Sequence, residues 1–147
     1  MRNQNVGSVS SGTMRPEDLI PSFIWQLQHQ EPCHRERSKL CTAISKRMDE
    51  DNYFASEDAD YDLDSLFDAL NEYAPAYLYF GAHPGDGSDY GFWLSEGFAE
   101  DFDGLKVSDT SEVPRGYSGE VLHVNDHGNC TLYTYSRGRG REVWAIV

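Results

Sequence analysis

A segment of 58 residues without lysine or arginine is the feature that most constrains how this chain can fold. It runs from Met48 to Leu105 and holds 16 of the 25 carboxylates, whereas the rest of the chain has 12 basic and 9 acidic residues. The same segment contains 13 of the 19 aromatic residues, so it has the apolar side chains that a packed core needs. Acidity spread over a whole surface would indicate solubility or salt tolerance, but its confinement to one segment that can pack indicates a local acidic surface.

The length of the chain predicts one domain, which we place at residues 16–147. Residues 1–15 are rich in Ser, Asn and Gly and predict a disordered N-terminal tail. No apolar run approaches the roughly 18 residues of a transmembrane helix. The N-terminus also lacks the apolar core of a secretory signal, so we expect a cytoplasmic protein that does not bind membranes.

Hydrophobic periodicity predicts three helices in the first half of the chain. The first begins at Pro21, and the second covers residues 33–49 with a basic outer face. The third covers residues 61–74, with Asp60 or Asp62 as its N-terminal cap.

Strand patterns follow the helices. Segment 83–89 predicts a hairpin with Asp-Gly in its turn, residues 105–107 a short strand, and residues 119–147 a three-strand meander. We therefore predict an α+β fold in which two to three N-terminal helices (16–75) pack on a C-terminal antiparallel sheet of four to five strands (76–147).

Carboxylates recur every fourth residue along the third predicted helix. Four of them share one side, opposite its apolar face: Asp60, Asp64, Asp68 and Glu72. The helical rise of about 1.5 Å per residue spaces them by about 6 Å. Phosphates of a DNA strand are roughly 3.4 Å apart along the axis. The two spacings become comparable if the carboxylates at 49–51, 57–58 and 100–103 fill the gaps in the row.

Three interpretations of this row remain open. It is a solvated helix face, it pairs with the basic second helix, or it docks on a basic partner. The second helix offers five cations, Arg35, Arg37, Lys39, Lys46 and Arg47, which cannot neutralise sixteen carboxylates.

Two turn segments, 83–89 and 123–129, each combine histidine with aspartate. If the two turns met, His83, His123 and His127 could serve a small metal-dependent enzyme. Hairpin turns also require Asp, Asn and Gly, and the chain has no HExxH or EF-hand pattern. We therefore expect turn chemistry here, with no metal and no cofactor.

Three arginines, Arg137, Arg139 and Arg141, lie near the tip of a predicted hairpin. They could contact phosphate or an acidic partner, or keep a sheet edge soluble. The net charge of −13 argues against direct nucleic-acid binding because the overall field repels DNA.

The stretch DEDNYFASEDADYDLDSLFD, in a small chain rich in aromatic residues, resembles the acidic DNA-mimic proteins of phages and mobile elements. That class includes anti-restriction and anti-CRISPR inhibitors, which occupy the nucleic-acid groove of a host defence enzyme. The resemblance is one of composition and charge layout over residues 49–103, without a shared motif. It implies an inhibitor whose partner is a nucleic-acid-binding enzyme or defence complex.

We therefore expect a non-enzymatic binding protein whose negative face docks on a basic, nucleic-acid-binding site of a partner protein. The alternatives are an immunity-type inhibitor of a toxin, the metal-dependent enzyme, and an oligomeric structural protein. The residues expected to bind the partner are Asp49, Glu50, Asp51, Tyr53, Glu57, Asp58, Asp60, Tyr61, Asp64, Asp68 and Glu72. Aromatic residues among the acids would serve as anchors that lose water on binding.

Overall fold

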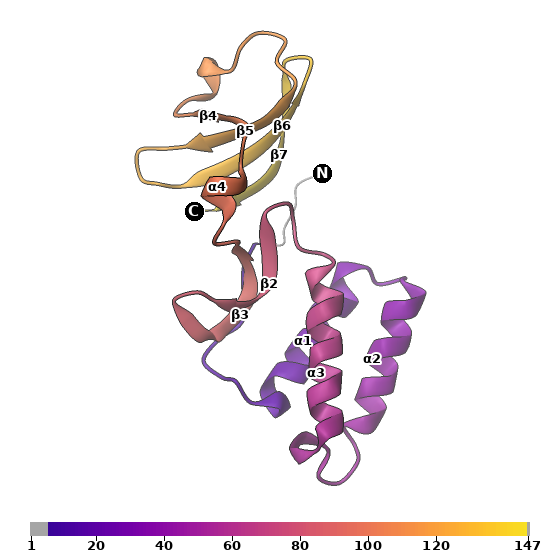
Figure 1. The fold of residues 1–147 in the computed structure, drawn as a ribbon. Helices are drawn as coiled ribbons and strands as arrows, with labels where there is room; N and C mark the ends of the chain where they lie inside the picture. Colours follow the sequence, from indigo (N-terminus) through magenta and orange to yellow (C-terminus); the bar gives the residue numbers. More distant parts are fainter. Residues whose placement is uncertain (1–5, 147) are drawn as a thin grey trace. The chain divides into compact units, whose positions relative to one another are not determined.

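The computed structural model describes residues 6–146 and confirms an α+β fold, with helices toward the N-terminus and strands toward the C-terminus (Figure 1). The elements are β1 (Gly7–Ser10), α1 (Pro16–Gln30), α2 (Arg35–Arg47), the 3-10 turn η1 (Tyr53–Ala55), α3 (Glu57–Asn71), β2 (Leu78–His83), β3 (Asp86–Leu94), α4 (Phe98–Asp101), β4 (Leu105–Val107), the 3-10 turn η2 (Thr110–Glu112), β5 (Gly119–Val124), β6 (Cys130–Ser136) and β7 (Arg139–Ile146). In this part of the chain, no helix has both the length and the apolar character to cross a membrane.

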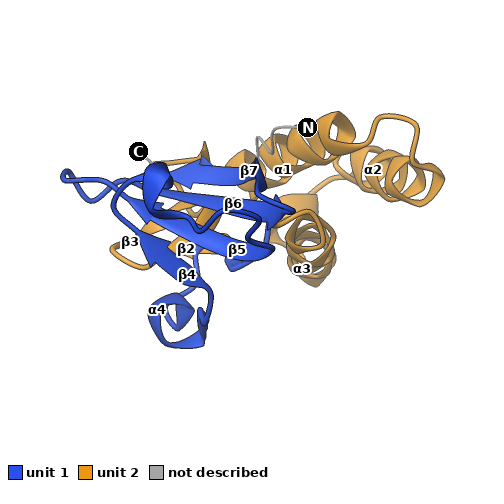
Figure 2. Ribbon diagram, turned by 90° about the horizontal axis from the view of Figure 1, so that it is seen from above, with its two compact units in different colours: residues 1–7, 75–78, 94–147 blue, residues 8–74, 79–93 orange. Residues whose placement is uncertain are grey.

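The chain divides into two compact units, and each contains one sheet (Figure 2). Of the described residues, unit 1 comprises 6–7, 75–78 and 94–146, and unit 2 comprises 8–74 and 79–93. The sheet that lies mainly in unit 2 has the order β1-β3-β2, and the sheet of unit 1 has the order β4-β5-β6-β7. The single sheet expected from the sequence is thus replaced by two, because β3 pairs with the N-terminal strand β1 rather than with the later strands.

The N-terminal segment also differs from expectation. Residues 7–10 form β1 inside the stretch that composition assigned to a disordered tail, and the first five residues of that stretch lie outside the described residues. The pairing of β1 with β3 gives this polar strand the backbone hydrogen bonds that its sequence alone does not predict.

In unit 2, helices α1 and α3 pack together with the sheet through an aromatic cluster. The Phe23 ring of α1 lies 5.1 Å from Phe67 of α3 and 5.2 Å from Phe80 of β2, edge to face in both cases. Tyr90 of β3 lies 6.0 Å from Phe23. Such pairs add to the free energy of burial, and they fix which side of α3 faces inward.

In unit 1, the fully buried Trp144 of β7 anchors the core, and its Nε1–H donates to the carbonyl of Ala76 at 2.8 Å. Phe98 of α4 packs edge to face on Trp144. Strands β5, β6 and β7 form the predicted antiparallel meander. β4 instead pairs parallel to β5, because the connection over residues 108–118 is long enough to return the chain in the same direction.

Two helix starts and one turn differ from the sequence analysis. α1 begins at Pro16 with Pro21 inside it, because its buried face already starts at Leu19 and Ile20. α3 begins at Glu57, ahead of both predicted caps. The hairpin between β2 and β3 turns at residues 84–85, so the Asp-Gly pair lies in β3 rather than in the turn.

Candidate docking surface on helix α3

The apolar side of α3 determines where its carboxylates point. Ala59, Leu66, Ala69 and Leu70 are buried on the side that packs in unit 2. The periodicity of 3.6 residues per turn places the residues between them on the opposite, solvent-facing side. That outer side carries five of the eleven residues that the sequence analysis selected.

We define the α3 acidic face as Glu57, Asp60, Tyr61, Asp64 and Asp68, all of which are exposed. The face spans eleven residue steps, or about 16 Å along the helix axis. Within residues 6–146, its carboxylates have no ion pair and no side-chain hydrogen bond. Tyr61 lies among them with 72% of its surface exposed. The structure thus places an aromatic ring inside an uncompensated acidic row.

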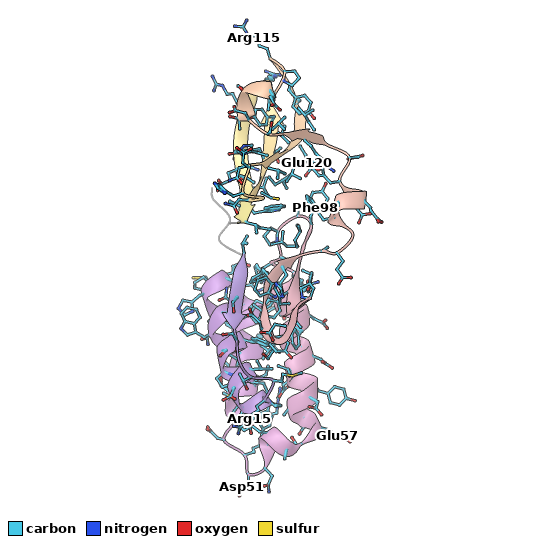
Figure 3. All side chains as sticks on the ribbon, turned by 90° about the vertical axis from the view of Figure 1, so that its left-hand side faces the viewer. Arg15, Asp51, Glu57, Phe98, Arg115 and Glu120 are labelled. Carbon is cyan, nitrogen blue, oxygen red and sulfur yellow. The ribbon has the colours of Figure 1, made fainter. Side chains whose placement is uncertain are left out.

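The loop before α3 adds carboxylates near the N-terminal end of that helix. Asp49, Glu50 and Asp51 are exposed, and so is Asp58 in the first turn of α3. Figure 3 shows the side chains of Asp51 and Glu57 pointing outward at one end of unit 2. These four residues therefore lie at the N-terminal end of α3, and their role in partner binding stays a prediction.

Tyr53 does not belong to this surface, so the prediction that it contacts the partner is wrong. It is only 3% exposed, and its hydroxyl donates to Asp62 Oδ2 at 2.6 Å. Arg47 donates to the same carboxylate through Nε at 2.8 Å and Nη2 at 2.6 Å. We call Arg47, Tyr53 and Asp62 the Asp62 clamp. It joins α2, η1 and α3 inside unit 2.

The clamp shifts the ionisation of two of its members. Burial raises the pKa of Asp62, but the hydrogen bonds from Arg47 and Tyr53 outweigh it, so the pKa lies below its ordinary value. The pKa of Tyr53 is raised, first by burial and then by its hydrogen bond to ionised Asp62. Asp62 is thus a structural carboxylate within the acidic run. In the sequence, Asp62 falls outside the four-residue row and lies close to Leu63 and Leu66 of the apolar face. This position is the sequence signal for its structural role.

Glu72 is exposed but compensated, because it forms an ion pair with Arg37 of α2. The guanidinium of Arg37 also lies 5.8 Å from the ring centroid of Tyr73. Arg37 near the start of α2 therefore meets the end of α3, whereas Arg47 at the end of α2 meets Asp62 near its start. The proposed pairing of the basic helix with the acidic row holds for Glu72, whereas Asp62 lies off that row, and the α3 acidic face remains outside the pairing.

The carboxylates at 100–103, expected to extend the row, belong to unit 1. Glu100 and Asp101 lie in α4, and Asp103 follows it. They therefore do not form part of the α3 acidic face, which lies entirely in unit 2.

The histidines of the metal alternative belong to different units. His83 of β2 in unit 2 accepts the Gly85 N–H through Nδ1 at 2.9 Å and meets Trp93 edge to face at 4.7 Å. His123 of β5 in unit 1 has its Nε2 at 3.1 Å from the carbonyl oxygen of Ser108, and His127 is exposed in the next turn. Among the described residues, no three His, Cys, Asp or Glu side chains form a group that could hold a metal ion.

Comparison of the chain with protein-family models, curated proteins and solved structures finds no match in any of the three. The site is therefore interpreted from its own geometry and charge.

Proposed function

We propose that the protein is a non-enzymatic binding protein whose α3 acidic face docks on a basic, nucleic-acid-binding surface of a partner protein. The observation that carries the proposal is the set of exposed, unpaired carboxylates on one side of α3, with the exposed Tyr61 ring among them. Like charges four residues apart cost a helix about 0.2–0.5 kcal/mol per pair. The face therefore lowers the stability of α3, and a cationic partner would remove that cost.

The chemistry of the face suits a surface that binds phosphates. Arginine forks on the partner would find carboxylate oxygens as bidentate acceptors. The carboxylates would replace phosphates, and docking would release the counterions held by the acidic face, as protein binding releases those of DNA. Tyr61 would supply an apolar contact that loses water on docking, which is typical of residues that contribute most to binding.

This proposal keeps the resemblance to DNA-mimic anti-defence proteins as its most specific form. An immunity-type inhibitor of a toxin would use the same surface and differ in the partner alone. The identity of the captured protein separates the two.

Affinity capture tests the proposal. We expect the wild-type protein to capture, from lysate of its host cell, a DNA- or RNA-binding protein that duplex DNA or RNA displaces. The capture should weaken roughly tenfold or more between about 50 and 200 mM NaCl because several charged contacts are screened. The variant with Asp60, Asp64 and Asp68 changed to Asn should lose the partner.

A matched control separates the face from net charge. The variant Glu100→Gln/Asp101→Asn/Asp103→Asn removes the same number of charges from unit 1 and should keep the partner. Capture that survives neutralisation of α3, or that neither duplex DNA nor RNA displaces, would contradict the proposal.

A further inference from the structure

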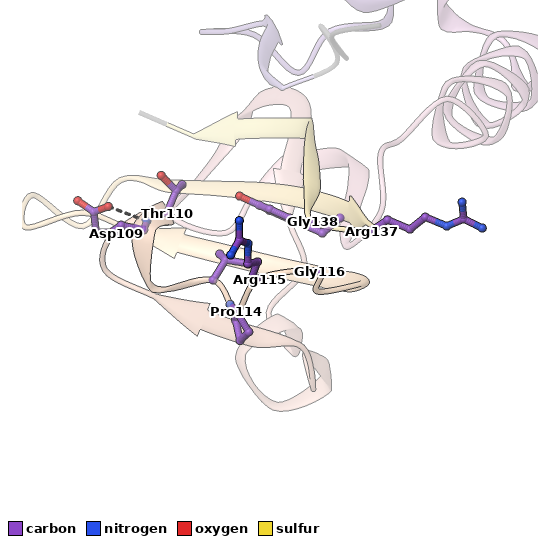
Figure 4. A pocket seen from close by; sticks show the side chains of 10 residues that line it. Asp109, Thr110, Pro114, Arg115, Gly116, Arg137 and Gly138 are labelled. Atoms are coloured by element: carbon purple, nitrogen blue, oxygen red, sulfur yellow. Dashed lines mark hydrogen bonds between the residues drawn. The ribbon is translucent and has the colours of Figure 1, made fainter.

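A pocket in unit 1 lies where the segment after β4 meets the hairpin between β6 and β7 (Figure 4). Its volume is about 450 Å³, within the roughly 300–1,000 Å³ of small-molecule sites. We call it the Arg115 pocket, and its main lining residues are Asp109, Thr110, Ser111, Arg115, Tyr135 and Arg137. None of them belongs to the α3 acidic face.

The backbone holds the pocket in shape without a ligand. Arg137 N–H donates to Ser118 Oγ at 3.0 Å, and Gly138 N–H donates to the carbonyl of Tyr117 at 2.9 Å. A Cβ atom on Gly138 would lie 3.0 Å from Gly116 N, and Gly138 has a φ of +82°, so only glycine fits this contact without strain. The loop and the hairpin are therefore joined directly beside the pocket.

An aromatic ring forms one wall. The Tyr135 ring lies across Gly140, where a Cβ atom would come within 2.7 Å of it. Tyr117 and Tyr133 pack against the same ring, with centroids 6.3 Å and 6.1 Å away. These contacts hold Tyr135 in place, so the pocket offers a fixed aromatic surface.

The charges of the pocket are separated. Figure 4 shows the Arg115 side chain between Asp109 and Thr110 on one side and Arg137, which extends outward, on the other. Within residues 6–146, neither arginine has a carboxylate within ion-pair distance. Asp109 accepts the Ser111 N–H at 2.8 Å, and this bond lowers its pKa and keeps it ionised. The pocket is thus cationic at the arginines and anionic at Asp109.

We propose that the Arg115 pocket binds a small ligand with an oxyanion group, phosphate or carboxylate, held by Arg115 and assisted at the rim by Arg137. A guanidinium presents a planar fork of donors that fits either group. The remainder of the ligand packs on Tyr135, and its uncharged end faces Asp109. This site goes beyond the proposed docking function because it lies in unit 1 and uses no residue of α3.

Two ring-bearing probes that differ in their oxyanion test the proposal. Phenyl phosphate and benzoate are titrated into the full-length protein at constant ionic strength, and amide shifts are followed by ¹H–¹⁵N NMR. We expect saturable shifts at residues 109–116 and 135–138 with one probe or both. The probe that binds more tightly identifies the oxyanion.

Three arginine variants decide whether the pocket is responsible. Arg115→Gln should weaken binding about tenfold, the loss expected for one charge-assisted bidentate contact, and Arg137→Gln should weaken it less. Arg141→Gln removes an exposed arginine of β7 that does not line the pocket and should leave binding unchanged. No saturable shift with either probe, shifts confined to other residues, or equal weakening by Arg115→Gln and Arg141→Gln would each overturn the proposal. Unchanged amide resonances of residues outside the pocket, in each variant without ligand, show that the fold is intact.

Discussion

Asp62 shows how one residue of an acidic run can serve the fold while its neighbours face solvent. It is 7% exposed and accepts three hydrogen bonds, two from Arg47 and one from Tyr53. A buried carboxylate is tolerated only when partners of this kind replace its lost water. The Asp62 clamp therefore ties the end of α2 to α3 and holds the intervening loop.

We expect Asp62→Asn to lower the free energy of unfolding by roughly 2 kcal/mol, because the amide has no charge to pair with Arg47 and replaces one acceptor oxygen with an NH2 donor. Asp51→Asn removes an exposed carboxylate from the loop before η1 and should change stability little. Because the pKa of Asp62 is lower in the folded than in the unfolded chain, its contribution is present above about pH 4 and is lost as the pH falls further. Urea denaturation at several pH values should show a gap between wild type and Asp62→Asn that is constant near neutrality and narrows in acid. A gap that is unchanged down to pH 2 would contradict this account.

At the scale of single elements, α3 combines a packed side with a side whose charges repel each other. Asp64 lies between Asp60 and Asp68, four residues from each, so it takes part in both like-charge pairs. We expect Asp64→Asn to raise the free energy of unfolding by about 0.5 kcal/mol, because it relieves both repulsions. The gain should disappear in 1 M NaCl, where the Debye length is about 3 Å.

The same Asp64→Asn protein should bind the captured partner more weakly than the wild type does. Denaturant titration and a binding assay on one preparation measure both effects. Higher stability with unchanged affinity would remove Asp64 from the docking surface.

Local periodicity was sufficient to predict the outer side of α3, because side chains four residues apart share a face in any helix. It did not reveal the position of Tyr53. The positive φ of 60° at Asn52 lets the loop turn so that Tyr53 points inward. The sequence analysis left open that the acidic row pairs with the second helix, but it could not identify Glu72 and Arg37 as partners, because these residues are far apart in the sequence.

Contacts between distant segments are also the reason why the sequence did not predict two separate sheets. The strand patterns of β2, β3 and β5–β7 were read correctly in outline, but a pattern identifies a strand and not its neighbour. β1 and β3 pair across more than seventy residues, and β4 pairs in parallel with β5. The Arg115 pocket was missed for the same reason, since its two halves come from separate segments, although contact with phosphate was one of the roles left open for Arg137.

At the scale of the whole molecule, the charge is unevenly divided. Among the described residues, unit 2 has sixteen carboxylates and six Lys or Arg, a formal charge of −10, and unit 1 has nine and five, a formal charge of −4. Uncompensated charge of one sign opposes compaction, and salt screens that repulsion. Salt should therefore have two opposite effects on this protein, strengthening unit 2 while weakening its docking.

Amide hydrogen exchange at low and high salt tests the first effect. Between about 20 and 500 mM NaCl we expect exchange in α3 to slow roughly threefold, because screening removes several tenths of a kcal/mol of repulsion, while β6 in unit 1 changes less. The variant with Asp60, Asp64 and Asp68 changed to Asn is the control, and α3 in it should lose most of its response to salt. Equal slowing in α3 and β6, or a full response in the neutralised variant, would show that the α3 acidic face is not a source of repulsion. The carboxylates would then have no stored repulsion for a basic partner to relieve, and the docking proposal would lose the energetic part of its support.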